Sequence, residues 1–292
     1  MSSESSRAAE VEVLEPVHSD LSAESGHAAG EDAAPLEGGG DGDEPEKSAK
    51  DEFIEIAKTI FYALLIALVL RVLLFQPFTI PSASMEPNLY EGDYIIVSKW
   101  NYGYSKHSIP LSPPLIKGRL FNNGPERGDI VVFKLPRDNK TDYIKRVIGL
   151  PGDRVQMRDN KLYINGQPVQ DVVKGPIEVM DPNGRQSSGV TATETLPNGK
   201  SFTTQDFGPN GWLDDTGVYT VPAGHYFMMG DNRDNSIDSR VDVSSGVGLV
   251  PEENLVGKAQ IILFSWSPGV SLWNPVSWFT KLRPSRFFTV LQ

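Results

Sequence analysis

Hydrophobic residues are distributed in two different ways along the chain, and the change comes near residue 75. Residues 53–75 form one apolar stretch of 23 residues, which as a helix would be about 34 Å long and could cross a hydrocarbon core of about 30 Å. The stretch is apolar on all sides, and the stems of Lys58 and Arg71 can extend toward the two interfaces. More than 50 mostly acidic residues precede it, unlike a cleaved signal peptide. We therefore predict a single transmembrane helix rather than a signal peptide or a buried core helix.

Short apolar stretches that alternate with turn signals follow from residue 76 onward. Strong turn dipeptides at Asp159-Asn160 and Asn165-Gly166 predict an antiparallel meander over 153–169. No long amphipathic helix interrupts the series, so the predicted fold class is mostly β, with an antiparallel barrel or sandwich as its core. The predicted strands cover residues 94–98, 130–134, 143–148, 154–157, 161–164, 217–221, 225–229 and 258–264.

Two segments depart from this pattern. Residues 174–216 are rich in Gly, Pro, Asn, Ser and Thr and have weak apolar periodicity, so we interpret them as part of an inserted β lobe or an extended hairpin. Residues 267–292 hold aromatic and basic residues, which suit a membrane interface and an ordinary docked C-terminus equally. The predicted organisation is an acidic tail (1–52), a transmembrane helix (53–75), a β core (76–153 and 223–266), an inserted β lobe (154–222) and the C-terminal segment (267–292).

The net charge of the chain is −11, but this charge is unevenly distributed. Residues 1–52 contain 15 Asp or Glu and three Lys or Arg, whereas the remaining 240 residues carry 23 acidic and 24 basic side chains. The part after the tail has no excess positive charge with which to attract nucleic acid, so we expect no nucleic-acid partner. The tail has too few apolar residues to offset its ordering entropy, which predicts disorder.

Basic residues flank the apolar stretch asymmetrically. Lys47, Lys50 and Lys58 lie toward its N-terminal side, while the next basic residue after position 75 is Lys99. Positive charge near a membrane span favours the cytoplasmic side, and acidic residues contribute little to this rule. The pattern predicts a single-pass protein of the cytoplasmic (inner) membrane, with its N-terminus in the cytoplasm and the part after the span on the outer (periplasmic) side.

The reactive side chains exclude several kinds of site. The chain has no cysteine, which rules out disulfides, a cysteine nucleophile and a thiolate metal site. Of its four histidines, His18 and His27 lie in the tail, and neither G-x-S-x-G nor H-E-x-x-H occurs. A zinc site and a Ser-His-Asp triad are therefore poorly supported. We interpret His225, beside a predicted strand, as structural.

Three short segments carry the candidate chemistry. Residues 81–87, PSASMEP, place Ser84 nine residues beyond the apolar stretch, within about 30 Å of extended chain from the membrane. In residues 142–153, DYIKRVIGLPGD, period two puts Lys145 among apolar neighbours, where lost hydration would lower its pKa. Residues 230–240, GDNRDNSIDSR, predict a tight hydrogen-bonded loop whose two arginines argue against a calcium site. Taken singly, the first two segments favour a plain turn and a solvent-facing lysine on an edge strand, and the third also fits a solvated turn.

Together, in this order and after an apolar anchor, the three segments resemble the bacterial type I signal peptidases, serine proteases with a Ser-Lys dyad. The resemblance covers residues 53–264 and is most specific in the third segment. This chain has a single predicted span, whereas some members of the family have two, but this departure does not affect the motifs. It implies that Ser84 is the nucleophile and that neutral Lys145 is the general base. The other implied roles are an oxyanion-hole hydroxyl beside the Ser84 N–H (Ser82), a residue that orients Lys145 (Ser236), a supporting ion pair (Asp238 and Arg240) and shallow pockets for small residues (Phe78, Ile80, Met85, Leu89, Tyr143 and Ile144).

The resemblance also implies a function, namely a membrane-anchored endopeptidase that removes signal peptides from exported preproteins after small residues of the Ala-x-Ala type. Its partners would be the signal peptides, the phospholipid membrane and the protein-export translocon, and no cofactor or metal is implied. One alternative is a related Ser-Lys protease with another substrate, such as a self-cleaving regulator, which the anchor and the outward topology disfavour. The other is a non-catalytic tethered β module that binds peptides, which the presence of both Ser84 and Lys145 disfavours.

Overall fold

A computed structural model of the protein describes residues 48–109, 112–180, 186–209, 211–270 and 274–291. Most of the acidic tail, residues 1–47, therefore lies outside the described residues, and its predicted disorder stays a prediction.

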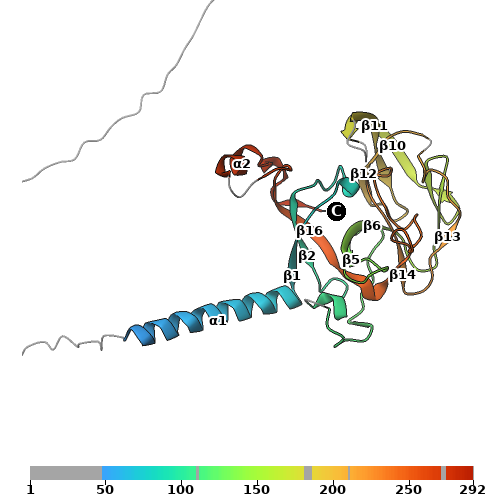
Figure 1. Ribbon diagram of the computed structural model, residues 1–292. Helices are drawn as coiled ribbons and strands as arrows, with labels where there is room; N and C mark the ends of the chain where they lie inside the picture. The colour runs from blue at the N-terminus through green and yellow to red at the C-terminus, as the bar shows by residue number, and fades with distance from the viewer. Residues whose placement is uncertain (1–47, 110–111, 181–185, 210, 271–273, 292) are drawn as a thin grey trace, which may run out of the picture. The chain divides into compact units, whose positions relative to one another are not determined.

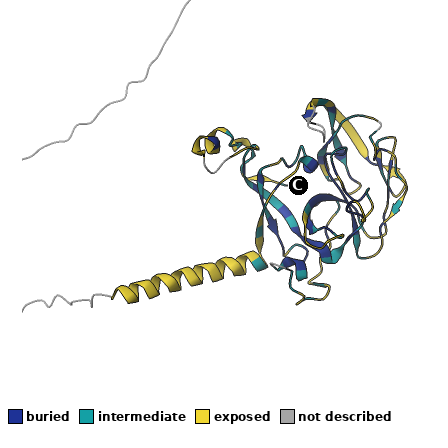
Figure 2. Cartoon of the chain, in the orientation of Figure 1, coloured by how far each residue is buried: buried dark blue, intermediate teal, exposed yellow. Residues whose placement is uncertain are grey.

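Helix α1, Ala49–Leu73, contains most of the apolar stretch (Figure 1). Its sequence is rich in Ala, Leu and Ile and has no Gly or Pro, which favours an α-helix. No residue of α1 is buried against the protein, as Figure 2 shows, whereas a surface helix of a water-soluble domain would bury one face. With 25 residues it is about 38 Å long, and among the described residues it is the one helix long and apolar enough to cross a membrane.

A curled antiparallel sheet of eight strands forms the centre of the β structure (Figure 1). Seven strands follow the order β1-β2-β16-β5-β6-β14-β15, and β17 pairs with β16 outside this path. This half-barrel confirms the predicted mostly β, antiparallel fold class. The strands are β1 (Phe75–Thr79), β2 (Asp93–Ser98), β5 (Ile130–Lys134), β6 (Asp142–Gly149), β14 (His225–Met229), β15 (Val250–Pro251), β16 (Leu255–Ser265) and β17 (Thr289–Val290).

Three smaller sheets and several short helices complete the described structure. One sheet has the order β13-β7-β8-β9, in which β7, β8 and β9 pair consecutively and confirm the predicted meander over 153–169. Its strands are β7 (Arg154–Arg158), β8 (Lys161–Ile164), β9 (Gln167–Pro168) and β13 (Tyr219–Thr220), and those of the next sheet are β10 (Gln170–Met180), β11 (Gln186–Thr195) and β12 (Ser201–Asp206). The remaining elements are the pair β3 (Tyr104–Ser105) and β4 (Arg119–Leu120), the 3-10 helices η1 (Ala83–Met85), η2 (Lys106–Ser108), η3 (Glu252–Asn254) and η4 (Pro284–Arg286), and helix α2 (Pro275–Thr280).

Strand β6 lies at the meeting point of three hydrophobic clusters. Ile144 belongs to the cluster formed with β1, β2 and β16, Ile148 to the cluster formed with β7 and β8, and Val147 to a third cluster with β5. Every residue of β6 from Ile144 to its end is buried, so both faces of the strand are covered. A polar side chain in the middle of β6 is therefore removed from water whichever face it occupies.

The C-terminal segment is attached to the large sheet. Strand β17 pairs with β16, and Arg286 forms an ion pair of 2.6 Å with the buried Asp93 of β2. Trp278 and Phe279 of α2 are exposed. The docked and the membrane-interface interpretations of this segment both remain compatible with these contacts, and the membrane contact stays a prediction.

Candidate active site

Ser84 lies in η1, a single 3-10 turn that follows strand β1. The side chain of the next residue, Met85, is fully buried in the hydrophobic core and anchors the turn there. From the opposite side, Asn232 donates its backbone N–H to the Ser84 carbonyl at 3.2 Å and its side-chain amide to the Ala83 carbonyl at 3.2 Å. Two segments far apart in the sequence therefore fix the position of the Ser84 hydroxyl.

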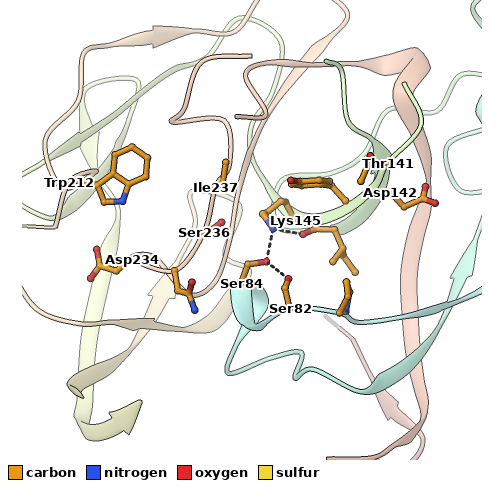
Figure 3. A pocket seen from close by; sticks show the side chains of 13 residues that line it. Ser82, Ser84, Thr141, Asp142, Lys145, Trp212, Asp234, Ser236 and Ile237 are labelled. Atoms are coloured by element: carbon orange, nitrogen blue, oxygen red, sulfur yellow. Dashed lines mark hydrogen bonds between the residues drawn. The ribbon is translucent and has the colours of Figure 1, made fainter. Parts of the chain in front are cut away.

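Lys145, from the middle of β6, reaches this hydroxyl (Figure 3). Its Nζ lies 2.7 Å from Ser84 Oγ and 2.9 Å from the carbonyl oxygen of Ile144. The side chain is 3% exposed, and burial lowers the pKa of Lys145 from its usual range to about 8. The carboxylates of Asp238 and Asp231 act in the opposite direction without overcoming the effect of burial. About a tenth of this amine is consequently neutral at pH 7, and about half at pH 8.

The loop 230–240, which follows β14, is held by a buried ion pair. Arg240 donates to both carboxylate oxygens of Asp238 at 2.9 Å, and Gly230 N donates to the same carboxylate at 3.0 Å. Burial alone would raise the pKa of Asp238, but Arg240 and the backbone donors outweigh it and lower the pKa below its usual range. The structure thus brings together the two residues that the resemblance assigned to a supporting ion pair.

Ser236 lines the same pocket as Lys145. It is 4% exposed, and among the described residues its Oγ has no hydrogen-bond partner. A Cβ added to Gly230 would overlap both Ser236 Oγ and the Ser84 carbonyl oxygen, so glycine at 230 permits the close approach of these two segments. The predicted hydrogen bond from Ser236 to Lys145 stays a prediction.

A pocket of about 540 Å³ surrounds the Ser84 and Lys145 side chains (Figure 3). Ser82 also lines it, with its Oγ 3.4 Å from Ser84 Oγ. Its other lining residues are Pro81, Thr141, Asp142, Tyr143, Ile144, Trp212, Asp234, Asn235, Ser236 and Ile237.

Of the six predicted pocket residues, Tyr143 and Ile144 line this pocket. Ile80, Met85 and Leu89 instead lie in the hydrophobic core, at most 2% exposed, and Phe78 packs against that core. Their predicted contacts with a substrate remain predictions. Sequence reasoning missed Trp212, whose segment has no strand pattern, and Ile237, which stands beside a residue already chosen for another role.

The two described histidines lie outside this pocket. Nδ1 of His107, in η2, lies 3.0 Å from Ser112 Oγ, and Nδ1 of His225 lies 3.0 Å from the Ala223 carbonyl oxygen. Neither contacts Ser84 or Lys145 in the described structure, so the geometry offers no histidine base for Ser84.

Among the described residues, one group of carboxylates has the spacing to hold a metal ion, and Asp234, which belongs to it, also lines the pocket. The ligand atoms of Asp206, Asp214 and Asp234 lie within 4.8 Å of one another. Backbone N–H groups already satisfy part of the cluster, since Gly208 N donates to Asp206 and Gly211 N to Asp214, each at 2.7 Å. An acidic cluster alone does not define a cation site, and we assign none.

Comparison with known proteins gives consistent matches. The family model described as "Signal peptidase, peptidase S26" matches residues 53–266. Signal peptidase I of Rickettsia typhi is 40% identical over 265 residues, covering 85% of this chain and 96% of that protein. Signal peptidase I of Rickettsia akari is 40% identical over 259 residues, covering 83% and 93%. A crystal structure of a signal peptidase I from Enterococcus faecalis is 30% identical, and the match covers 47% of this chain and 97% of the crystallised chain. The TM-score of this match is 0.27, which is too low to support a comparison of the two folds.

The family model covers most of the chain, and both Rickettsia proteins are matched over nearly their whole length. The chain therefore belongs to the signal peptidase I family, peptidase S26, whose members are serine endopeptidases that cleave signal peptides.

Proposed function

We propose that this signal peptidase uses Ser84 as its nucleophile and Lys145 as its general base. The observation that carries the proposal is the 2.7 Å contact between Ser84 Oγ and the Nζ of a buried lysine whose pKa is lowered to about 8. A lysine accepts a proton only in its neutral form, and burial supplies that form without a histidine.

The reaction proceeds in two halves. Ser84 Oγ attacks the carbonyl carbon of the scissile bond while its proton passes to Lys145 Nζ. When the tetrahedral intermediate collapses, the C–N bond breaks and the Lys145 ammonium protonates the leaving amine, which becomes the new N-terminus of the mature protein. A water then attacks the Ser84 ester and gives its proton to Lys145; as the ester bond breaks, this proton returns to Ser84 Oγ.

Four further residues support this reaction in the proposal. The Ser82 hydroxyl, 3.4 Å from Ser84 Oγ, and the Ser84 backbone N–H donate to the oxyanion that forms on the substrate carbonyl. Ser236 offers to Lys145 a hydroxyl that has no other partner among the described residues, and so limits the rotation of the amine. Asp238, paired with Arg240, holds the loop that carries Ser236.

Specificity for small residues before the cut follows from the pocket side lined by Tyr143 and Ile144. Ile144 is 8% exposed and belongs to the hydrophobic core, so its side chain cannot move aside without disrupting packing. A shallow apolar surface of this kind accepts Ala and rejects larger side chains on steric grounds.

Cleavage of a preprotein by purified protein tests the proposal. We expect mass spectrometry to locate the cut after an Ala-x-Ala sequence, and we expect Ser84→Ala to lose at least about 10³-fold in rate. Ser244→Ala, a serine substitution in an exposed stretch outside the pocket, is the matched control and should cleave normally. A Ser84→Ala enzyme with wild-type activity would remove Ser84 from the mechanism.

We further propose that the part of the chain after α1 lies on the outer side of the cytoplasmic membrane, where exported preproteins and the export translocon would meet it. The proposal rests on Lys47, Lys50 and Lys58 on the N-terminal side of the span. A reporter fused after Ser98 should be active only outside the cytoplasm. Protease added outside spheroplasts should digest the chain after α1 and spare residues 1–52; protection of the β structure instead would reverse the topology.

A further inference from the structure

The pocket around Ser84 extends in two directions, and the proposed specificity uses only one of them. In Figure 3, Asp142 lies on one side of Lys145 and Trp212 on the other. A peptide that is cleaved at Ser84 must extend beyond the scissile bond in both directions. If residues before the cut occupy the Tyr143 side, the side with Trp212 is the space for residues after it.

This second side has an apolar wall made of two large, solvent-exposed side chains. Trp212 is 65% exposed and Ile237 is 51% exposed, yet both line the same pocket as Ser84 and Lys145. Apolar surface left open beside reacting atoms is typical of a surface that a ligand covers during binding. The cavity of about 540 Å³ lies within the range of about 300–1,000 Å³ in which proteins bind drug-sized ligands, so it can hold more than one peptide residue.

The Trp212 side of this wall is attached to the loop 230–240, which carries Ile237, by a row of hydrogen bonds. Gln205 of β12 donates its N–H to the Asp231 carbonyl at 3.0 Å, and Arg233 donates its N–H to the Gln205 carbonyl at 2.8 Å. Phe207 N then donates to the Asp234 carboxylate at 2.8 Å. The chain that leaves β12 toward Trp212 is thus held along the loop that carries Ser236.

Two further contacts stabilise this arrangement. The buried Arg233 forms a bidentate ion pair with Glu194 of β11, in which one N–O distance is 2.6 Å. This ion pair joins the β10-β11-β12 sheet to the loop 230–240. Immediately before Trp212, Gly211 N donates to the Asp214 carboxylate at 2.7 Å and Asp214 N donates back to the Gly211 carbonyl at 3.2 Å. The backbone around Trp212 therefore forms a turn that these hydrogen bonds close.

We propose that Trp212 and Ile237 form the subsite for the first residues of the mature protein, and that this subsite favours apolar side chains there. The turn that carries Trp212, residues 211–214, is then a specificity element of the enzyme. The inference rests on the proposed roles of Ser84 and of the Tyr143 side of the pocket.

Two preproteins that differ only in the first two residues after the cut test this subsite. Both carry Ala-x-Ala before the cut; one continues with Leu-Leu and the other with Gly-Gly. We expect wild-type kcat/KM to be about tenfold higher for the Leu-Leu substrate, a difference of about 1.4 kcal/mol. Trp212→Ala should bring the two substrates within about twofold, and Ile237→Ala should reduce the ratio partly. Trp212→Phe, which keeps an aromatic surface, should retain most of the preference.

Trp278→Ala is the matched control, because Trp278 is also an exposed tryptophan but does not line the pocket. It should leave the wild-type ratio unchanged. A wild-type enzyme that cleaves both substrates equally, or a Trp212→Ala enzyme that keeps the tenfold ratio, would overturn the inference. The ratio does not depend on which group is the nucleophile, so Ser84→Ala activity separates a failure of the proposed mechanism from a failure of this subsite.

Discussion

Replacing Lys145 by arginine should lower kcat/KM by at least about 10²–10⁴-fold. The substitution keeps the positive charge and nearly the length of the side chain, but a guanidinium does not lose its proton at working pH. Lys145 Nζ lies 2.7 Å from Ser84 Oγ, and burial lowers the lysine pKa to about 8. If this amine accepts the Ser84 proton, a permanently charged group in its place cannot. Initial rates of preprotein cleavage measure the loss.

Two companion variants separate chemistry from folding. Lys145→Met places an uncharged, apolar side chain at the same buried position; it should be equally inactive while keeping a wild-type-like unfolding temperature. Lys161→Arg, the same substitution at an exposed position in β8, should cleave normally. A histidine base makes the opposite prediction, in which His107→Ala or His225→Ala is inactive. A Lys145→Arg enzyme with near-normal activity would contradict the Ser-Lys mechanism.

A phenylalanine immediately before the cut should reduce kcat/KM by at least about 100-fold relative to alanine. The cause is steric, since a large side chain must enter the pocket beside Tyr143 and the buried Ile144. We expect leucine at the same substrate position to be rejected for the same reason. Parallel kinetics on substrates that differ only at this position measure the effect.

Enlarging the pocket provides the control. Ile144→Ala removes three carbon atoms from the pocket wall and should recover part of the cleavage of the leucine substrate. Ile148→Ala makes the same change in the same strand, at a core position outside the pocket, and should not recover it. Equal cleavage of the alanine and phenylalanine substrates by the wild-type enzyme would contradict the pocket assignment.

The periodic parts of the fold could be predicted from the sequence. Strands β5, β8 and β14 begin and end where the apolar pattern and the turn residues predicted, because each has a buried face and a clear boundary. For the region that forms strands β10, β11 and β12, the sequence predicted only an inserted lobe or an extended hairpin, without strand boundaries. Their sequence lacks an alternating apolar pattern, and side chains such as Val172 and Val173 are exposed. Strand β1 was also missed, since its sequence FQPFT begins on the last residue of the predicted apolar stretch and has no alternating apolar pattern.

The proposed reacting pair could be predicted for a different reason. Ser84 and Lys145 stand in segments with unusual composition, and the resemblance gave these segments a shared role. The sequence predicted apolar neighbours for Lys145 but not its burial on both faces of β6, because that burial depends on three clusters from distant parts of the chain. Nor could it place Trp212 in the pocket of Ser84, since that position depends on backbone hydrogen bonds between β12 and the loop that follows β14.

The pH dependence of kcat/KM tests the central claim most directly, because it reports the ionisation of the base in the free enzyme. In the proposed mechanism only the neutral form of Lys145 accepts the Ser84 proton, so activity should be lost as the pH falls below the lysine pKa. With that pKa at about 8, the wild-type rate should rise about tenfold per pH unit between pH 5 and 7, bend near pH 8 and level off above it. Measured from pH 5 to 10, a bend near pH 8 is the result that the Ser84–Lys145 mechanism predicts. A bend near pH 6.5, the usual range of histidine, or a rate independent of pH would contradict it.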